Sequence, residues 1–515
     1  MQVLNYTSVK LRLAVSVGSN ALRALISFAT GLFIARALNP AGYGNLMFLL
    51  GSFVAIRLLF DMGSSSAFFT FLSQRARGGR FYLVYFSWLA FQFVATLILL
   101  WLIIPSTLLE KIWIGNSREI VILAFVATFM QQQIWQLVGQ VGESMRKTIK
   151  VQFMNLSVAL LYLLVILLLS TYGKLTVQNV LFVLVIQYVI ATVLAYLYLR
   201  KDHLILVTDE KSLSRILLDY WNYCSPLLIM ALVGFSYDFA DKWMLQKFGG
   251  AIQQGFFQIA SQCAAVSLLA TASILSVFWK EVAAAWNKQD RARVAMLYRK
   301  VSRGLVMLGA IMSGLLMPWS EKIVNILLSA DYINSWPIFA IMLLYPIHQS
   351  MGQICGSMFL ATGQTRQYMI ISLFVMAVSI PVTYVVLAPA ANGWMPGFGL
   401  GALGLACKMV VINIVSVNFQ SWILARYMKW KYDWVYQLVG IPLMMVLGYV
   451  AQMFTKVFWN IGNVNLSELI LPVIITSVLY AIMVVITIGQ LPWLVGSDRG
   501  EIQLLFGRIK AVFNF

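Results

Sequence analysis

Apolar residues fill this chain in long runs that are separated by short polar segments. The runs do not follow the two-residue period of a β-strand, and each holds roughly the 20 apolar residues that a helix needs to cross a bilayer. Because backbone groups in lipid must be satisfied within the segment, helices are the expected spanning elements. The pattern predicts fourteen transmembrane helices, near residues 12–36, 43–73, 81–104, 119–143, 151–171, 177–199, 216–246, 251–279, 300–319, 336–360, 368–388, 400–426, 433–455 and 467–489.

Composition leads to the same fold class. The 515 residues are 61% hydrophobic and only 11% charged, with a mean hydropathy of +0.83, whereas a soluble domain carries about 25% charged residues. We therefore predict an all-α polytopic membrane protein. The net charge of +19 would also suit a nucleic-acid partner. The cations cluster between the predicted helices, however, so no nucleic-acid partner is expected.

Basic residues are unequally shared between the two sides of the membrane that the predicted helices define. If the N-terminus is cytoplasmic, 26 of the 37 Lys and Arg lie in the inner loops and termini, and four lie within helices. Cytoplasmic loops carry such an excess in helical membrane proteins, so both termini are predicted to be cytoplasmic. The outer loops hold the remaining seven, Arg36, Lys111, Arg118, Lys174, Lys247, Lys322 and Lys456.

Cofactor and metal motifs are not indicated by the sequence. The segment Gly399–Gly404 has the spacing G-x-G-x-x-G, but it opens an apolar helix with no strand before it, which favours close helix packing over dinucleotide binding. The chain has no phosphate-binding G-x-x-x-x-G-K-[ST] segment. Its two histidines are isolated and metal-ligand spacing is lacking. Neither a cofactor nor a metal is expected. Four cysteines fall in or at the ends of predicted helices and are expected to be buried structural thiols: Cys224, Cys263, Cys355 and Cys407.

The four cations within predicted helices are the first candidates for a functional site: Arg23, Arg57, Lys242 and Lys408. A charge at membrane depth is costly, and such residues usually face a protein interior or a water-filled cavity. Arg23 and Lys408 have no acidic partner at helical spacing, so we expect both to face one solvated cavity. Four cations inside the membrane indicate a path for a negatively charged cargo.

Amide side chains form a second group. Gln132, Gln136 and Gln140 recur every four residues on one face of the fourth predicted helix, with Glu143 close by. A similar seam in the eighth predicted helix comprises Gln254, Gln258, Ser261 and Gln262. Such groups suit the hydroxyls of a sugar. Hydrogen bonding between helices is the alternative explanation.

Acidic residues and one histidine are candidates for coupling or gating: Asp61, Glu143, Asp238, Asp241 and His348. Asp61 lies four residues after Arg57, and Asp238 lies four residues before Lys242, so each carboxylate could instead neutralise its neighbouring cation. His348 is either a packing contact or a proton relay.

The order of turns and basic loops also repeats along the chain. Turns at residues 36–44 and 246–255 separate pairs of predicted helices, and basic inner loops follow both turns. Parallel repeats of this kind are a known transporter plan, with the substrate at the interface of the halves. We predict an N-terminal lobe at 1–199 and a C-terminal lobe at 200–430. Two extra helices are expected at 431–489, followed by an amphipathic basic tail at 490–515 on the inner leaflet.

Three motifs resemble those of a known family. Ala35-Arg-Ala-Leu-Asn-Pro-Ala-Gly-Tyr-Gly44 is similar to the signature that ends the first span of O-antigen repeat-unit flippases (Wzx-like), within the multidrug/oligosaccharidyl-lipid/polysaccharide (MOP) exporter superfamily. Asp61-Met-Gly63 resembles the turn of their second span. Ala240-Asp-Lys242, followed by Gly255, resembles their seventh and eighth spans. The resemblance covers most of residues 12–430 in order and spacing.

The resemblance implies two six-helix lobes in a V around a cavity that opens alternately to each side. The expected cargo is an oligosaccharide on undecaprenyl diphosphate, moved across the bacterial cytoplasmic membrane for O-antigen, capsule or exopolysaccharide assembly. Expected partners are that glycan, membrane lipids, a polysaccharide polymerase and a chain-length regulator. The in-span cations fit this cargo, because Arg and Lys both bind phosphate.

Two other functions are kept as alternatives. The first is a cation-coupled antiporter of drugs or small molecules from the same superfamily, which would have an acidic cavity. The second is an envelope polysaccharide polymerase or ligase, an enzyme class whose members carry a long outer loop that this chain lacks. We therefore expect a transporter and no enzymatic activity.

Overall fold

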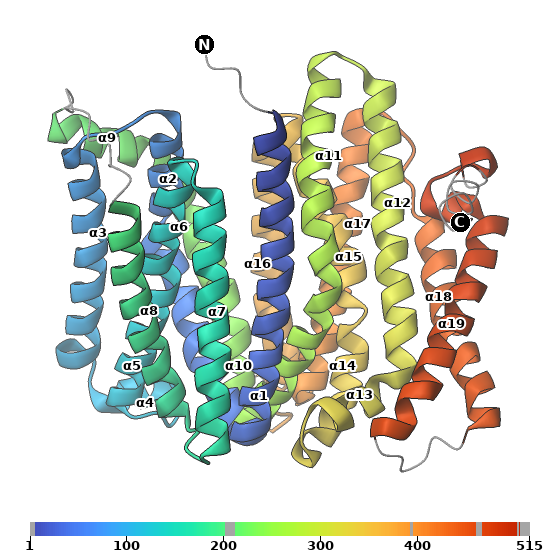
Figure 1. Cartoon of the computed structure of the whole chain (residues 1–515), viewed down its shortest axis with the longest axis horizontal. Coiled ribbons are helices and arrows are strands. Elements are labelled where there is room, and N and C mark those ends of the chain that lie inside the picture. Colours follow the sequence, from blue (N-terminus) through green and yellow to red (C-terminus); the bar gives the residue numbers. More distant parts are fainter. Residues whose placement is uncertain (1–5, 201–211, 392–394, 460–465, 502–503, 505–515) are drawn as a thin grey trace. The chain divides into compact units, whose positions relative to one another are not determined.

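The computed structural model describes residues 6–200, 212–391, 395–459, 466–501 and 504. Helices dominate these residues, which include no β-strand (Figure 1). Twelve helical segments among them are long and apolar enough to cross a membrane. The predicted fold class, an all-α polytopic membrane protein, is confirmed. In the predicted tail, residues 502–503 and 505–515 lie outside the described residues.

Two of the twelve segments are much longer than one membrane crossing requires. They cover Val15–Asp61 and Leu213–Leu268, with 47 and 56 residues. Each covers most or all of one predicted transmembrane helix and more than half of the next, with a kink between the two. The predicted count of fourteen helices remains a prediction.

The two kinks have nearly the same backbone geometry. Helix α1 (Tyr6–Asp61) bends at Asn39, where φ is 54° and ψ is 174°. Helix α10 (Leu228–Ala265) bends at Gly250, where φ is 77° and ψ is 176°. The kinks lie in the two stretches, 36–44 and 246–255, where the sequence predicted turns. The repeated order of turns and basic loops in the sequence therefore identified the positions of both kinks.

The chain divides into two compact units. Unit 1 comprises Met1–Gln258 and Met376–Leu405. It contains α1 and most of α10, the ends of two further helices, α16 (Thr365–Leu387) and α17 (Gly401–Met428), and eight helices between α1 and α10. These eight are α2 (Ser64–Gln74), α3 (Gly79–Ile98), α4 (Ser106–Ile112), α5 (Arg118–Phe129), α6 (Trp135–Ser144), α7 (Thr148–Thr171), α8 (Val177–Arg200) and α9 (Leu213–Cys224).

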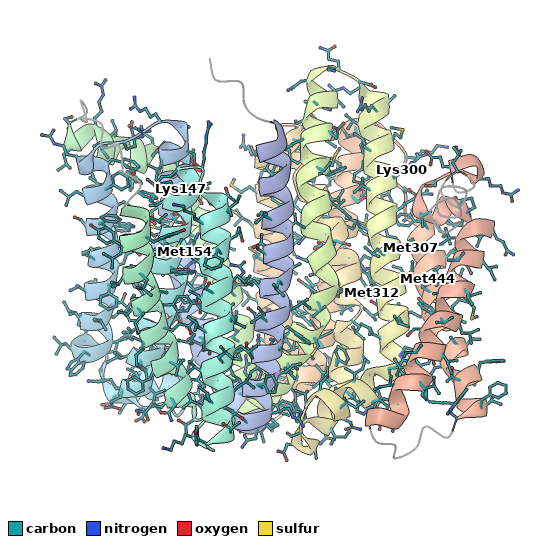
Figure 2. The ribbon with its side chains drawn as sticks, in the orientation of Figure 1. Lys147, Met154, Lys300, Met307, Met312 and Met444 are labelled. Carbon is teal, nitrogen blue, oxygen red and sulfur yellow. The ribbon has the colours of Figure 1, made fainter. Side chains whose placement is uncertain are left out.

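Unit 2 comprises Ile259–Val375 and Ala406–Phe515. Its apolar core includes Met307 of α12 and Met444 of α18. Lys300 lies on α12 about two turns closer to the N-terminal end of that helix than Met307 (Figure 2). The helices that lie wholly within this unit are α11 (Leu269–Asn287), α12 (Arg291–Leu316), α13 (Ser320–Leu327), α14 (Trp336–Met342), α15 (Tyr345–Ala361), α18 (Val435–Phe458) and α19 (Leu466–Gln490). The predicted lobes at 1–199 and 200–430 and the pair at 431–489 remain predictions.

Two glycines allow the kinked segments of unit 1 to pack backbone against backbone. A Cβ at Gly44 would overlap the carbonyl oxygen of Ala251, and a Cβ at Gly255 would overlap that of Pro40. The contact is reciprocal, because each glycine meets the turn of the other kinked helix. Glycine is required here by the close approach of two backbones.

Unit 1 also contains two π-helical turns, at Leu99–Ile103 and Met130–Ile134. A π turn closes its hydrogen bonds over five residues instead of four, and such turns occur frequently at functional sites. The second turn lies between α5 and α6 and contains Gln132, the first of the three glutamines that the sequence places on one helix face.

Candidate functional site

Arg57 bonds to two of the glutamines that the sequence predicted for cargo binding. Its Nη1 donates to the backbone carbonyl of Gln132 at 2.7 Å and to Oε1 of Gln136 at 2.8 Å. The guanidinium is half-buried. Arg57, Gln132 and Gln136 therefore form one cluster within unit 1, which we call the Arg57 cluster.

The π turn explains how a helix carbonyl can bind Arg57. The amide of Trp135 donates to the carbonyl of Met130, five residues earlier, so the ordinary ladder is interrupted around Gln132. A carbonyl displaced from that ladder can accept a hydrogen bond from a neighbouring helix. Charge-assisted hydrogen bonds are stronger than neutral ones, so these contacts fix the guanidinium firmly.

The carboxylate of Asp61 is engaged elsewhere in unit 1. Its Oδ1 accepts from the Ser65 amide at 3.0 Å and from Oγ of Ser64 at 3.1 Å, while Oδ2 accepts from Oγ of Ser65 at 2.9 Å. It thereby binds the amide end of α2, after a turn in which Met62 and Gly63 have positive φ. The sequence left open a direct ion pair between Arg57 and Asp61. In the structure these two described residues do not form one.

Lys242 also bonds to a carbonyl. Its Nζ donates to the backbone oxygen of Asp238 at 3.1 Å. The aliphatic part of the side chain crosses Gly51 of α1, where a Cβ would lie 2.7 Å from Cδ and 2.8 Å from Cε. Gly51 therefore provides the space in which Lys242 lies. The neighbouring Asp241 accepts from the hydroxyl of Thr383 at 2.6 Å, within the same unit.

Arg23 and Lys408 belong to different units. Arg23 is exposed on α1. Lys408, on α17, is only 4% exposed. The cavity that these two cations were predicted to share remains a prediction.

The other predicted residues have varied environments. Gln140 has a buried Oε1 with no hydrogen-bond partner among the described residues, whereas Glu143 is exposed near the end of α6. Gln258 is half-buried in α10. His348 is buried in unit 2, where its Nε2 lies 3.1 Å from Oε1 of Gln437. The roles predicted for these four residues remain predictions.

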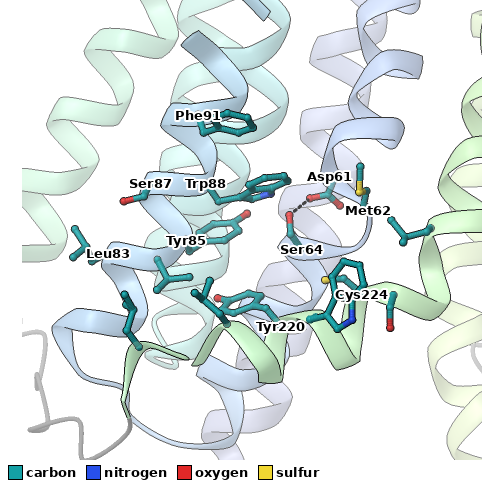
Figure 3. Close-up of a pocket in the computed structure, with 16 residues that line it drawn as sticks. Asp61, Met62, Ser64, Leu83, Tyr85, Ser87, Trp88, Phe91, Tyr220 and Cys224 are labelled. Carbon is teal, nitrogen blue, oxygen red and sulfur yellow. Dashed lines mark hydrogen bonds between the residues drawn. The ribbon is translucent and has the colours of Figure 1, made fainter. Parts of the chain in front are cut away.

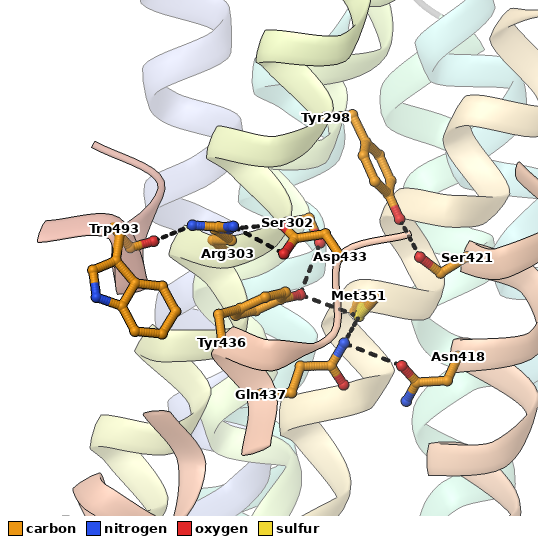
Figure 4. A network of polar contacts seen from close by, with 10 residues as sticks. All are labelled: Tyr298, Ser302, Arg303, Met351, Asn418, Ser421, Asp433, Tyr436, Gln437 and Trp493. Carbon is orange, nitrogen blue, oxygen red and sulfur yellow. Dashed lines mark hydrogen bonds and ion pairs between the residues drawn. The ribbon is translucent and has the colours of Figure 1, made fainter. Parts of the chain in front are cut away.

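A network of polar contacts in unit 2 was not predicted from the sequence (Figure 4). Arg303 binds both carboxylate oxygens of Asp433, at 2.7 and 2.8 Å. Nε2 of Gln437 donates to Asn418 at 3.1 Å. The network joins α12, α17 and the start of α18. Because its members are far apart in sequence, no spacing rule could reveal it.

Unit 1 has an open groove between α3 and α9, with a volume of about 700 Å³. Its walls are mostly apolar and aromatic and include Tyr85, Trp88 and Tyr220 (Figure 3). Asp61 is the one carboxylate among the described residues that line it. We call it the α3–α9 groove. Sequence reasoning missed it, because it placed most of α9 in a membrane-spanning helix near 216–246, whereas the structure has α9 as a separate short helix.

No protein-family profile matches this chain, and no curated protein sequence matches it. Solved structures do resemble it. The lipid II flippase MurJ, in an inward closed conformation, has a TM-score of 0.68 at 12% identity, over 93% of this chain and 99% of its own. An inward-facing multidrug resistance MATE family transporter of the MOP superfamily has a TM-score of 0.63 at 13% identity, over 79% and 95%.

A third similar structure is a MOP superfamily transporter from Pyrococcus furiosus, which is described as having a binding pocket of reverse polarity. Its TM-score is 0.55 at 12% identity, over 81% of this chain and 95% of its own. At such identities the likeness is one of fold. The chain has the fold of MOP superfamily transporters, which agrees with the superfamily that the sequence motifs resemble.

Proposed function

We propose that this protein is a flippase that moves an oligosaccharide on undecaprenyl diphosphate across the bacterial cytoplasmic membrane by alternating access. The Arg57 cluster carries the proposal. It presents a half-buried guanidinium whose bonding partners are amides and a carbonyl, so the positive charge is not cancelled by a direct ion pair. A diphosphate that leaves water needs such charge-assisted donors.

Lys242 supports the same function. Its ammonium bonds to a neutral carbonyl and has further donors available, because a lysine ammonium carries three. Arg offers a planar fork and Lys a point charge, and both suit phosphate. The amides of Gln132 and Gln136 beside Arg57 suit sugar hydroxyls. The fold shared with a lipid II flippase is consistent with a lipid-linked glycan as cargo.

Transport by the purified protein tests this proposal. Proteoliposomes would contain a fluorescent undecaprenyl-diphosphate-linked oligosaccharide, and an impermeant quencher would report which leaflet holds it. We expect Arg57→Gln to slow translocation about tenfold or more, because a hydrogen bond to a charged group contributes roughly 1.5–3 kcal/mol. Lys242→Gln should have a similar effect.

Arg36→Gln is the matched control. Arg36 is an exposed cation on the same helix as Arg57, so this variant removes an equal charge away from the cluster and should translocate normally. Abundance and thermal unfolding of each variant would separate lost transport from lost folding. Normal translocation by stable Arg57→Gln and Lys242→Gln proteins would refute the anionic-cargo proposal.

One observation favours the antiporter alternative. The α3–α9 groove is lined by aromatic rings and by the carboxylate of Asp61, a combination that suits an amphipathic organic cation. Both oxygens of Asp61 already accept hydrogen bonds from serines, which weakens this case. Proton- or sodium-driven uptake of a fluorescent organic cation into proteoliposomes, lost in Asp61→Asn, would support the antiporter instead.

A further inference from the structure

A small cavity in unit 1 lies beside the guanidinium of Arg57. Its volume is about 20 Å³, and its lining comes from α1, α3, α5 and the π turn that follows α5. Four aromatic rings form much of the wall, those of Phe53, Phe60, Phe125 and Phe129. A water molecule needs a cavity of about 10–15 Å³, so this one has room for a water. We call it the α1–α5 cavity.

Two side chains that line the cavity have buried polar atoms without a partner. Nε of Arg57 and Oγ1 of Thr128 make no hydrogen bond to the described residues. Thr128 is only 3% exposed. Other buried threonines of unit 1, such as Thr30 and Thr96, donate to the carbonyl four residues earlier. Burying a polar atom without a partner is costly, so a polar ligand is expected beside Arg57 and Thr128.

Two amide side chains complete the polar part of the lining. Gln92 and Gln133 are 3% and 4% exposed. Nε2 of Gln92 donates to the carbonyl of Phe60 at 3.1 Å, so its Oε1 is an acceptor. Nε2 of Gln133 lies 3.5 Å from that Oε1, which is long for a hydrogen bond of this kind. An amide oxygen has two lone pairs, so Oε1 of Gln92 can accept from a second donor.

We propose that the α1–α5 cavity binds one water molecule that positions the guanidinium of Arg57. The water accepts from Nε of Arg57 and donates to Oγ1 of Thr128 and Oε1 of Gln92. Nη1 of Arg57 already donates to Gln132 and Gln136. Because a guanidinium is a rigid planar fork, a second contact at Nε fixes its plane, and the N–H groups of Nη2 are left for the cargo. The water site does not depend on the cargo, but its effect on transport rests on the proposed function.

The chemistry of the lining selects water over an ion. A chloride would accept from Nε of Arg57, but it would also face the amide oxygen of Gln92. A metal cation would be repelled by the guanidinium. Water both accepts and donates, and three partners are what a buried water typically has.

X-ray radiolytic footprinting of the full-length protein in detergent tests the water site. X-rays generate hydroxyl radicals from a bound water, and these oxidise the side chains next to it even where bulk solvent has no access. In wild-type protein, Phe53 and Phe125 are 3% and 5% exposed. We expect both to be oxidised about fivefold faster than Phe278, which is 3% exposed in the apolar core of unit 2.

Variants of Thr128 identify the hydrogen bonds. Thr128→Val keeps the shape of the side chain and removes the hydroxyl, so oxidation of Phe53 and Phe125 should fall to the level of Phe278. Thr128→Ser keeps the hydroxyl and should retain the oxidation. Thr30→Val is the matched control, because it removes a buried hydroxyl that lies outside the lining of the cavity. Its footprint should equal that of the wild type.

Transport in proteoliposomes tests the positioning of Arg57. Thr128→Val should slow translocation about fivefold, whereas Thr128→Ser and Thr30→Val should translocate normally. The water acts through Arg57, so Thr128→Val should add no further loss to Arg57→Gln. A purely structural role of Thr128 would slow both backgrounds alike.

Three results would overturn the proposal. Oxidation of Phe53 and Phe125 no faster than that of Phe278 in wild-type protein would show a dry cavity. Undiminished oxidation in Thr128→Val would contradict the assigned hydrogen bonds. An equal loss of transport from Thr128→Val with and without Arg57 would contradict the positioning role. If the protein moved no glycan, the wild-type footprint would still decide the water site, and it does so even if thermal unfolding shows Thr128→Val to be unfolded.

Discussion

At the scale of single residues, the backbone of the two kinks explains a difference between them. Gly250 and Asn39 both have positive φ with ψ near 180°, a region that residues other than glycine enter only at a cost of about 1–3 kcal/mol. The Asn39 side chain offsets part of that cost, because its Oδ1 accepts from the amide of Gly42 at 3.2 Å. Asn39 is thus both a strained residue and the cap of the helical segment that follows it.

We expect Asn39→Gly to raise the free energy of unfolding by about 1 kcal/mol. Glycine removes the backbone strain and is only a few tenths of a kcal/mol worse than asparagine as a cap. Asn39→Val should lower the free energy of unfolding by about 2 kcal/mol, since valine lacks the cap and is β-branched. Thermal unfolding in one detergent would measure both. Equal stability of the two variants would contradict the strain assigned to Asn39.

Gly51 is expected to control transport through Lys242. In Gly51→Ala, the new Cβ would displace the lysine stem, so translocation should fall about as far as in Lys242→Gln. The double variant should be no worse than either single one, because both changes act on one contact. Gly18→Ala is the matched control, since a Cβ there would meet nothing within 4 Å. An unchanged rate in Gly51→Ala would show that Lys242 can take another position.

At the scale of elements, two ion pairs join helices, and they differ in how far their side chains are buried. Arg303 of α12 binds Asp433 before α18, and their side chains are only 14% and 26% exposed. Its guanidinium also lies over the ring of Tyr436, 5.1 Å from the centroid. Arg293, also on α12, pairs with Glu281 of α11, but these side chains are 53% and 48% exposed. The first pair joins elements far apart in sequence, and the second joins neighbours.

The two arginines provide a matched comparison. Arg303→Ala should lower the free energy of unfolding by about 2 kcal/mol or more, because it leaves a partly buried carboxylate without its bidentate partner. Arg293→Ala should cost less than about 1 kcal/mol, as exposed pairs usually do. Thermal unfolding at low and high salt would distinguish them, with the salt effect larger for the exposed pair. Similar losses in both variants would contradict this ranking.

At the scale of the whole molecule, apolar runs and the order of turns and basic loops predicted the helices and the two kinks, because both depend on local sequence. The site was predicted in part. Helical spacing placed Gln132 and Gln136 on one face, and the structure brings both to Arg57. The same spacing suggested Asp61 as a partner of Arg57, but the turn at Met62 and Gly63 directs the carboxylate to α2. Contacts such as Gly51 with Lys242 join distant segments, so they follow only from the packing.

The predicted orientation in the membrane can be tested by labelling single cysteines with an impermeant thiol reagent. Lys174→Cys, in the turn between α7 and α8, should be labelled in intact cells. Gln289→Cys, in the turn between α11 and α12, should be labelled only after the membrane is permeabilised. The background would lack the four native thiols. Labelling of position 289 in intact cells would refute a cytoplasmic N-terminus with this arrangement of helices.

The π turn at Met130–Ile134 makes the chain length of this segment critical. Removing one residue there would let an ordinary α-helix run from α5 into α6, and each residue of an α-helix corresponds to a rotation of about 100°. The faces of α5 and α6 would then point in different relative directions, so Gln136 could not reach Arg57 while α5 kept its packing. A one-residue deletion should therefore be far more damaging here than in the exposed turn at 173–174. Related sequences that share the Arg57 cluster should align through this turn without gaps.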